Sequence, residues 1–329
     1  MTQITFADLF CGIGGFRLAL NNNGFKCVFS GEINPHACLM YKENFGDNPY
    51  CDISKFNPEE IPDFNILCAG FPCQAFSIAG NKNGFNDTRG TLFFDLCRII
   101  DIKKPDVLLL ENVKNLLNHD NGNTFNVIKT NLDNLGYNVF YEVLNAIDFN
   151  IPQNRERIIL VCLKRKSTLL KSNNFDFSLI NKNKNIHLNS ILEKENFVFL
   201  NPNEYTLIDN PKTQKSGLIF SGYRNKKQRI NGVKDNTQHL SRSHKQPNRI
   251  YNSNGTHPTL SSQESSGRYF ILIDNKVRKL TLLECYRLMG FPDSFIKSGS
   301  QTNLYNRIGN SVCIPMIDSV ANAIKIQLL

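Results

Sequence analysis

Residues 8–16 read DLFCGIGGF, a glycine-rich turn between an apolar run and the start of a helical pattern. The run Ile4–Phe10 predicts a strand, and Phe16–Asn22 predicts the helix that follows it. Because glycine has no side chain, a ligand can approach the backbone of such a turn closely. A nucleotide-binding turn in general and a simple tight turn both fit this pattern. The motif by itself therefore predicts a strand, a turn and a helix, and it leaves the ligand open.

The first half of the chain repeats this alternation of short apolar runs and helical stretches. The alternation is typical of a doubly wound, mostly parallel sheet. Further strands are predicted at Val28–Ile33, Asn65–Ala69, Val107–Glu111, Asn138–Val143 and Arg157–Leu163. Further helices are predicted at Pro35–Phe45, Leu92–Ile102 and Thr124–Leu135. We therefore expect an α/β fold for this part of the chain.

A different composition begins near Lys164, where Asn, Lys and Ser become frequent and the alternation is lost. A recognisable helix pattern returns at Thr281, because Thr-Leu-Leu-Glu is a capping box that can begin a helix. This helix is expected to run through Met289 and to end at Gly290. The change predicts a domain boundary, followed by a smaller domain that is mainly β or irregular.

The overall composition narrows the class of protein. The 329 residues are 41% hydrophobic, and no apolar run approaches the roughly 18 residues of a membrane span. The start of the chain lacks an export signal, so we expect a cytoplasmic protein. The ten cysteines are scattered without zinc spacing, which predicts reduced thiols and no metal site.

The charge of the chain points to a polyanionic partner. The formal net charge is +9, and the stretch between Gly217 and Arg249 carries eight basic residues against one acidic residue. Tyr, Gln and Asn side chains are interleaved with these charges, which favours contact with phosphates. A solvated basic loop is the alternative interpretation.

Polar side chains follow four of the predicted strands. Residues 11–15 follow the first strand, Glu32 ends the second, residues 72–74 (Pro-Cys-Gln) follow the third, and residues 111–112 (Glu-Asn) end the fourth. Ligands of an open parallel sheet bind beyond the carboxyl ends of its strands, so these residues are expected at one edge. An acidic group in the place of Glu32 can accept hydrogen bonds from ribose hydroxyls, although it could also be a charge at a helix N-terminus.

Three further residue types at this edge can carry chemistry. Cys73 lies in a loop beyond a buried strand, whereas most cysteines only pack. Glu111 ends an apolar strand, where a carboxylate can exchange protons; a helix N-cap is the alternative for the neighbouring Asn112. Arg155 and Arg157 alternate on the way into a strand, so both could point to the same side, but a salt-bridged edge explains them as well.

Together these motifs closely resemble the DNA cytosine-5 methyltransferases of bacterial type II restriction-modification systems. Six motifs occur in the order and spacing of that family: DLFCGIGGF, GFPCQAFS, ENV, QNRERI, RLMGFPDSF and NRIGNSV. The resemblance implies a class I, Rossmann-like methyltransferase fold that uses S-adenosylmethionine and releases S-adenosylhomocysteine. It assigns residues 1–190 plus 306–329 to a catalytic domain, and residues 191–305 to a target-recognition domain and hinge.

The resemblance also implies a role for each catalytic residue. Cys73 matches the nucleophile that adds to carbon 6 of a cytosine flipped out of duplex DNA. Glu111 matches the group that contacts N3 and the exocyclic amine. Arg157 matches an arginine that contacts the cytosine carbonyl, and Arg155 matches its support. No residue is assigned as the base that removes the proton from carbon 5.

Cofactor and DNA contacts follow from the same resemblance. The residues that match positions around S-adenosylmethionine are Phe10, Gly12, Gly14, Glu32, Ile33, Asp52, Ile53, Pro72, Leu92 and Asn310. The residues that match DNA contacts are Gln74, Ser77, Ala79, Gln246, Arg249 and Thr259. Residues 78–90 resemble a mobile lid, and the C-terminal segment is expected to pack back onto the N-terminal sheet. We expect a monomer that binds duplex DNA and is paired with a cognate restriction endonuclease.

Three rival functions remain beside this interpretation. An RNA cytosine-5 methyltransferase would share the catalytic motifs, but the long basic segment with its Thr259-Leu260 pair favours DNA. A catalytically silent DNA-binding relative would have little reason to keep Cys73, Glu111 and Arg157 together. A nicotinamide or flavin oxidoreductase needs the spacing GxGxxG, from which residues 11–15 depart.

Overall fold

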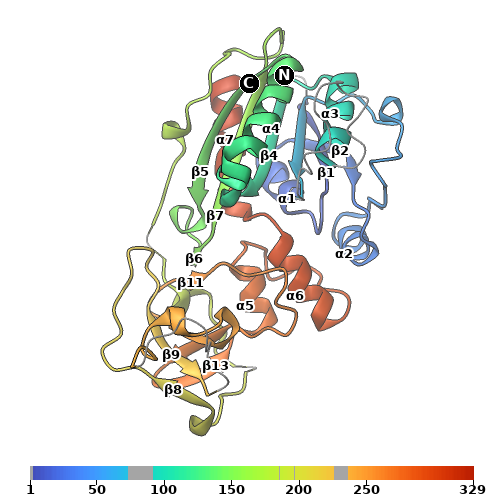
Figure 1. Cartoon of the computed structure of the whole chain (residues 1–329). Coiled ribbons are helices and arrows are strands. Elements are labelled where there is room, and N and C mark those ends of the chain that lie inside the picture. Colours follow the sequence, from blue (N-terminus) through green and yellow to red (C-terminus); the bar gives the residue numbers. More distant parts are fainter. Residues whose placement is uncertain (1–2, 73–91, 185, 196, 226–235) are drawn as a thin grey trace. The chain divides into compact units, whose positions relative to one another are not determined.

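The central sheet has six strands in the order β2-β1-β3-β4-β7-β5 (Figure 1). This computed structural model describes residues 3–72, 92–184, 186–195, 197–225 and 236–329. The strands are β1 (Thr5–Leu9), β2 (Lys26–Gly31), β3 (Ile66–Gly70), β4 (Val107–Val113), β5 (Tyr137–Asn145) and β7 (Glu156–Lys164). Strands β2, β1, β3 and β4 are parallel, and β7 runs antiparallel to both of its neighbours. The predicted mostly parallel sheet is confirmed.

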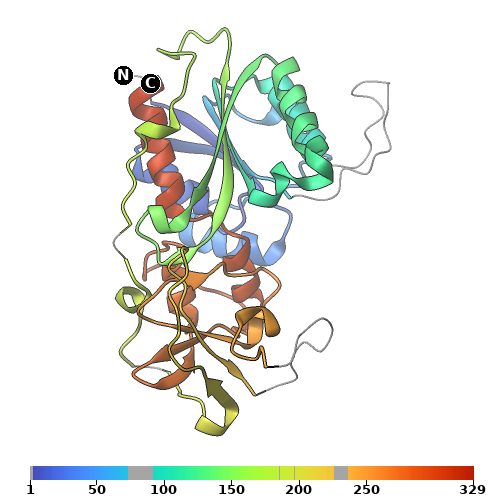
Figure 2. The same cartoon turned by 60° about the vertical axis from the view of Figure 1, so that its left-hand side comes forward.

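Helices cover both faces of this sheet, as Figure 2 shows. They are α1 (Gly15–Asn22), α2 (Pro35–Phe45), α3 (Leu92–Lys103), α4 (Asn123–Asn134) and α7 (Ile314–Leu328). Helix α1 packs against α7, and α3 contacts α4. Because both faces are covered, β4 can be continuously apolar: its residues 107–110 are fully buried. The return of the C-terminal helix to the N-terminal part of the chain is confirmed.

Local sequence explains where these helices begin. The Asn34 side chain accepts hydrogen bonds from the backbone nitrogens of His36 and Ala37, both at 3.1 Å, and Pro35 occupies the first turn of α2. Gly46 ends the same helix in the left-handed conformation. These signals explain why the predicted and observed bounds of α2 coincide.

The chain divides into two compact units. The first contains Met1–Asn145, Glu156–Asn181 and Ile314–Leu329, and the second contains Ala146–Arg155 and Lys182–Cys313. The second unit has a five-stranded sheet in the order β13-β12-β10-β9-β8. Its strands are β8 (Tyr205–Leu207), β9 (Phe220–Arg224), β10 (Arg249–Asn252), β12 (Phe270–Ile273) and β13 (Lys276–Lys279). A short parallel pair joins β6 (Gln153–Asn154) to β11 (His257–Pro258).

Two helices complete the second unit, α5 (Leu282–Arg287) and α6 (Gln301–Asn310). The capping box at Thr281 is present, because its side chain accepts from the backbone of Glu284 and the Glu284 carboxylate accepts from the backbone of Thr281. The predicted end at Met289 is two residues too late, since α5 ends at Arg287 and the chain then turns. The 3₁₀ helices along the chain are Pro58–Glu60, Lys114–Leu117, His119–Gly122, Ala146–Asp148, Phe177–Leu179, Leu188–Ile191, Pro202–Glu204, Ser241–Ser243 and Gln246–Asn248.

A buried ion pair connects several segments of this second unit. Arg278 of β13 and Glu284 of α5 are both fully buried, and their two hydrogen bonds measure 2.7 and 2.8 Å. The Glu284 carboxylate also accepts from the backbone nitrogen of Glu193 at 2.8 Å, and the Phe197 ring lies 4.1 Å from the Arg278 guanidinium. One carboxylate therefore joins a strand, a helix and a connecting segment.

Across the described ranges, every helix is too short or too polar to cross a membrane.

Candidate active site

The glycine-rich turn after β1 has left-handed backbone at three residues. Phe10, Gly12 and Gly14 have φ of 54°, 55° and 89°. A Cβ on Gly14 would lie 2.2 Å from the ring of Phe45, so only glycine fits there. A Cβ on Gly12 would meet nothing within 4 Å, so there is open space above this residue. The turn therefore has room for a ligand beside its backbone.

Glu32 is fixed beside this turn. One of its carboxylate oxygens accepts a hydrogen bond from the backbone nitrogen of Gly12 at 2.9 Å, and the other accepts from that of Asn34 at 2.7 Å. Sequence had placed Glu32 at the end of the second strand, and it follows the last residue of β2 directly. Two of the predicted cofactor residues are thus in direct contact at the carboxyl ends of β1 and β2.

Asp52 and Ile53 are brought to the same edge by a β-bridge. The bridge joins Glu32 to Tyr50, and the backbone nitrogen of Cys51 donates to the Glu32 carbonyl at 2.9 Å. The Ser54 hydroxyl, at 2.6 Å, and the Lys55 ammonium, at 3.0 Å, hold the pKa of the Asp52 carboxyl below its usual value. Asp52 is therefore an anion at neutral pH.

These residues fit S-adenosylmethionine. The open space over Gly12 lets a ligand approach the backbone, and the Glu32 carboxylate has the chemistry to bind ribose hydroxyls. The Ile33 side chain follows Glu32 and is 58% exposed, so it is an apolar surface that a ligand can reach. The observed groups thus match the chemically distinct parts of the cofactor.

Glu111 and Arg157 form an ion pair across β4 and β7. The Arg157 Nε lies 2.9 Å from one Glu111 carboxylate oxygen, and the two side chains are only 12% and 11% exposed. An Arg157 terminal nitrogen also donates to the carbonyl of Glu156 at 2.8 Å. Among the described residues, the second oxygen of Glu111 and the other terminal nitrogen of Arg157 have no protein partner. The pair therefore offers one acceptor and one donor, which suits the polar edge of a pyrimidine.

Asn112 is not a helix N-cap, contrary to the alternative drawn from sequence. It belongs to β4, is 3% exposed, and its amide donates to the carbonyl of Phe71 at 2.9 Å. The amide thus ties the end of β4 to the chain that leads into Cys73. This contact joins segments 41 positions apart, so no local sequence signal predicts it.

Arg155 and Arg157, which the sequence suggested could point to the same side of a strand, have different partners. Strand β7 begins at Glu156, so the alternation of side chains along a strand does not extend to Arg155. The Arg155 side chain is 1% exposed and belongs to the second unit. It donates to three carbonyls of that unit: those of Leu260 at 3.2 Å, Gly309 at 3.1 Å and Ser311 at 2.8 Å.

Thr259 is held within the same network. Its hydroxyl donates to the carbonyl of Asn154 at 2.7 Å, and the backbone nitrogen of Leu260 donates to the Gln153 side chain at 3.0 Å. A Cβ on Gly309 would lie 2.5 Å from backbone, so the end of α6 needs glycine to approach this segment. Asn310, a predicted cofactor residue, follows it and is exposed in the second unit.

Gln246 and Arg249 contact one another. An Arg249 terminal nitrogen donates to the Gln246 side-chain oxygen at 2.9 Å, and the Arg249 Nε donates to the carbonyl of His244 at 3.0 Å. The ring of Tyr223 stacks on that of His244 with centroids 4.0 Å apart, and burial lowers the pKa of His244. Arg224 also pairs with a carboxylate, that of Glu204 at 2.8 Å, so both of these arginines have protein partners.

Some predicted site residues lie outside the described residues: Cys73, Gln74, Ser77, Ala79 and the lid at residues 78–90. Pro72 is described and exposed, and Leu92 begins α3 and is half-buried.

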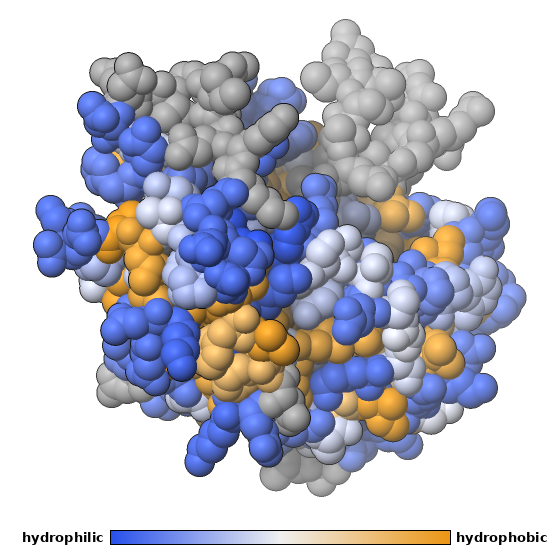
Figure 3. Space-filling view, turned by 90° about the horizontal axis from the view of Figure 1, so that it is seen from below, coloured by the Kyte–Doolittle hydropathy of each residue, from blue (hydrophilic) through white to orange (hydrophobic). Residues whose placement is uncertain are grey.

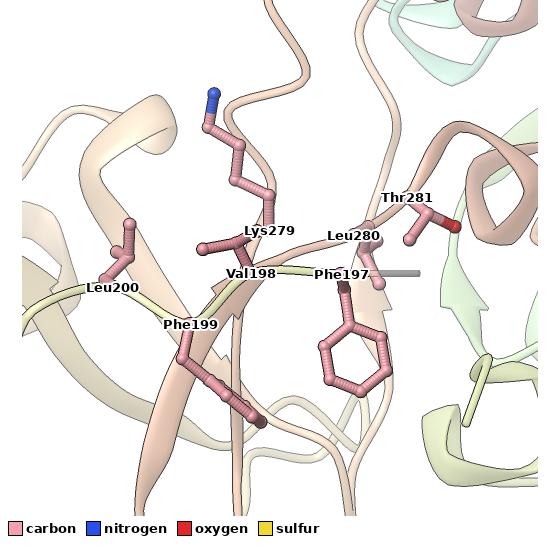
Figure 4. A pocket seen from close by; sticks show the side chains of 7 residues that line it. All are labelled: Phe197, Val198, Phe199, Leu200, Lys279, Leu280 and Thr281. Carbon is pink, nitrogen blue, oxygen red and sulfur yellow. The ribbon is translucent and has the colours of Figure 1, made fainter. Parts of the chain in front are cut away.

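A pocket in the second unit lies apart from the predicted site residues. Apolar side chains of residues 197–200 line it together with Lys279, Leu280 and Thr281 (Figure 4). Val198 at this pocket is 85% exposed. The space-filling view of the molecule from below shows apolar residues mixed with polar ones (Figure 3). Without polar groups that converge on it, the pocket has no features of a catalytic site.

Comparison with known proteins agrees with this geometry. The family model of the C-5 cytosine-specific DNA methylases matches residues 4–326. The type II methyltransferase M.HhaI of Haemophilus parahaemolyticus is 42% identical over 339 residues, which cover 98% of this chain and 94% of that protein. The type II methyltransferase M.HaeII of Haemophilus aegyptius is 41% identical, and the match covers 98% of this chain and 93% of that protein.

Solved structures share the fold at lower identity. The Dnmt2 methyltransferase of S. pombe superposes with a TM-score of 0.70 at 19% identity, and the match covers 98% of this chain and 99% of that one. Entamoeba histolytica methyltransferase EhMeth has a TM-score of 0.67 at 17% identity over 98% of each chain. The chain belongs to the C-5 cytosine-specific DNA methylases, and it is a DNA cytosine-5 methyltransferase that uses S-adenosylmethionine.

Proposed function

We propose that the chain methylates a cytosine within one short duplex sequence through a covalent bond from Cys73. The observation that carries this proposal is the Glu111–Arg157 pair, which leaves one acceptor and one donor at the edge of the sheet where the Gly12 turn and Glu32 also lie. A cytosine must leave the duplex to reach such an enclosed pair, at a cost of a few kcal/mol.

The chemistry begins with activation of the ring. The thiolate of Cys73 bonds to carbon 6, and Glu111 shares a proton with N3 so that the ring electrons collect at carbon 5. Arg157 donates to the carbonyl oxygen, which gains negative charge at this stage. Bound S-adenosylmethionine supplies the methyl group. Removal of the carbon 5 proton by a base then expels the thiolate and restores the ring.

The remaining residues are assigned to binding. We infer that the cofactor contacts Phe10, Gly12, Gly14, Glu32, Ile33, Asp52, Ile53, Pro72, Leu92 and Asn310. We infer that DNA contacts Gln74, Ser77, Ala79, Gln246, Arg249 and Thr259. Residues 1–190 plus 306–329 serve catalysis in this proposal, residues 191–305 serve target recognition, and no metal takes part.

The cellular role is inferred from the relatives, which are named type II methyltransferases. We propose that methylation protects DNA from a cognate restriction endonuclease, and that the enzyme works in the cytoplasm as a monomer. Arg155 acts as a positioning residue, since its three carbonyl contacts join the segment of Thr259 to the end of α6.

Labelled S-adenosylmethionine tests the substrate. The protein is incubated with duplex DNA or with RNA, and product cytosines are mapped by bisulfite sequencing. We expect label in DNA at one short motif, absent with Cys73→Ser and retained with Cys27→Ser, which makes the same change in β2. Label confined to RNA, or label with Cys73→Ser at the unmodified rate, would overturn the proposal.

A further inference from the structure

We propose that Lys114 binds a DNA phosphate beside the flipped cytosine, and that Glu156 holds this lysine at the site until DNA displaces the carboxylate. The inference rests on the proposed function, because it assumes that the target base contacts Glu111 and Arg157. It adds an exchange of partners, from carboxylate to phosphate, to the contacts assigned above.

Lys114 and Glu156 lie directly beside the Glu111–Arg157 pair. Lys114 follows the last residue of β4, and Glu156 is the first residue of β7. These two strands are adjacent in the sheet (Figure 1). They are antiparallel, with Val113 opposite Arg157. The Lys114 ammonium lies 2.8 Å from a Glu156 carboxylate oxygen. A base held by the Glu111–Arg157 pair therefore brings its own phosphates toward these two strand ends.

The two neighbouring ion pairs differ in how readily they can open. The side chains of Glu111 and Arg157 are almost enclosed, whereas those of Lys114 and Glu156 are 50% and 42% exposed. An exposed lysine–carboxylate pair contributes little to stability, so a competing anion can replace the carboxylate. DNA is a strong competitor, because each neutralised phosphate releases condensed counterions.

Glu156 has two effects in this arrangement. Without DNA it keeps the Lys114 ammonium over the strand ends, while its own carbonyl fixes Arg157 at 2.8 Å. When DNA arrives, the freed carboxylate faces the phosphates and opposes binding. The pair therefore places the lysine at the site and weakens contact with DNA at the same time, which favours release of the product.

Equilibrium binding tests the exchange. The duplex that contains the mapped methylation site is titrated with protein and S-adenosylhomocysteine by fluorescence anisotropy, between about 50 and 200 mM KCl. With Lys114→Gln we expect weaker binding and a slope of log K against log salt that is smaller by about one unit. Lys104→Gln is the matched control, because Lys104 is exposed just before the opposite end of β4, and its slope should equal that of the unmodified protein.

Glu156→Gln separates partner exchange from simple repulsion. We expect it to tighten DNA binding several-fold when Lys114 is present, and to have a smaller effect in the Lys114→Gln protein. An unchanged salt slope for Lys114→Gln, or equal tightening by Glu156→Gln in both proteins, would overturn the inference. Neither result would affect the proposed function, which fails only if the unmodified protein does not methylate DNA.

Discussion

At the scale of single residues, the Glu111–Arg157 pair is oriented before any base binds. Arg157 has two fixed contacts, an ion pair at 2.9 Å with the carboxylate and a hydrogen bond at 2.8 Å to a backbone carbonyl. A guanidinium held in this way loses little conformational entropy when it binds a third group. The pair can thus stabilise charge on the base without rearranging, which is the requirement for electrostatic catalysis.

Replacing the guanidinium should reveal this orientation. Arg157→Lys keeps the charge but cannot make both fixed contacts and also reach the base, so we expect kcat to fall by at least about 100-fold. The dissociation constant of S-adenosylmethionine should stay within about twofold. Steady-state kinetics and calorimetry measure the two quantities. Arg165→Lys, at the other end of β7, is the control, and an equal loss of kcat there would contradict the assignment.

Sequence predicted the residues of this pair but not all of their surroundings. Glu32 directly follows β2 and Glu111 lies near the end of β4, and sequence located both strands, so their common edge could be predicted. Asn112 and Arg155 could not be interpreted in the same way, because their partners are backbone carbonyls far along the chain. A carbonyl has no residue type to recognise, so such contacts are visible only in the folded structure.

At the scale of helices and strands, the first sheet was predicted well and the second was not predicted strand by strand. All six strands of the first sheet occur within about two residues of their expected ends. The strands β8 to β13 have two to five residues each, too few for a clear alternation of apolar and polar positions. The second unit was therefore expected only as mainly β or irregular.

The buried Arg278–Glu284 pair joins β13 to α5. Arg278→Met would leave a fully buried carboxylate without its counter-charge, so we expect the free energy of unfolding to fall by about 3–5 kcal/mol. The double change Arg278→Met with Glu284→Met should cost less than the sum of the two single changes. Urea denaturation measures all three proteins, and strictly additive losses would contradict a direct pair.

At the scale of the whole molecule, acid should weaken the fold through His257. This residue of β11 is fully buried, and burial lowers its pKa to about 4, although its ring donates to the Pro258 carbonyl. In the unfolded chain its pKa is about 6.5. Between these two pH values the unfolded state binds more protons than the folded state. The contribution of His257 to the free energy of unfolding is therefore complete above pH 6.5 and is lost as the pH falls toward 4.

The expected loss through this one residue is about 3 kcal/mol over that range. Urea denaturation at pH 7 and pH 5 covers part of this range and should show a loss of about 2 kcal/mol in the free energy of unfolding. His257→Asn should show a weaker dependence on pH, while His36→Asn, a change of an exposed histidine, should keep the original dependence. If the His257→Asn protein had the same pH dependence as the original, another group would have to be responsible.

The central claim concerns covalent activation of cytosine by Cys73. Addition of the thiolate at carbon 6 must labilise the proton at carbon 5, so release of tritium from duplex DNA labelled at that carbon reports the step directly. With S-adenosylmethionine present, we predict one tritium released for each methyl group transferred, and no release with Cys73→Ser. Tritium release at the unmodified rate by Cys73→Ser would contradict the account.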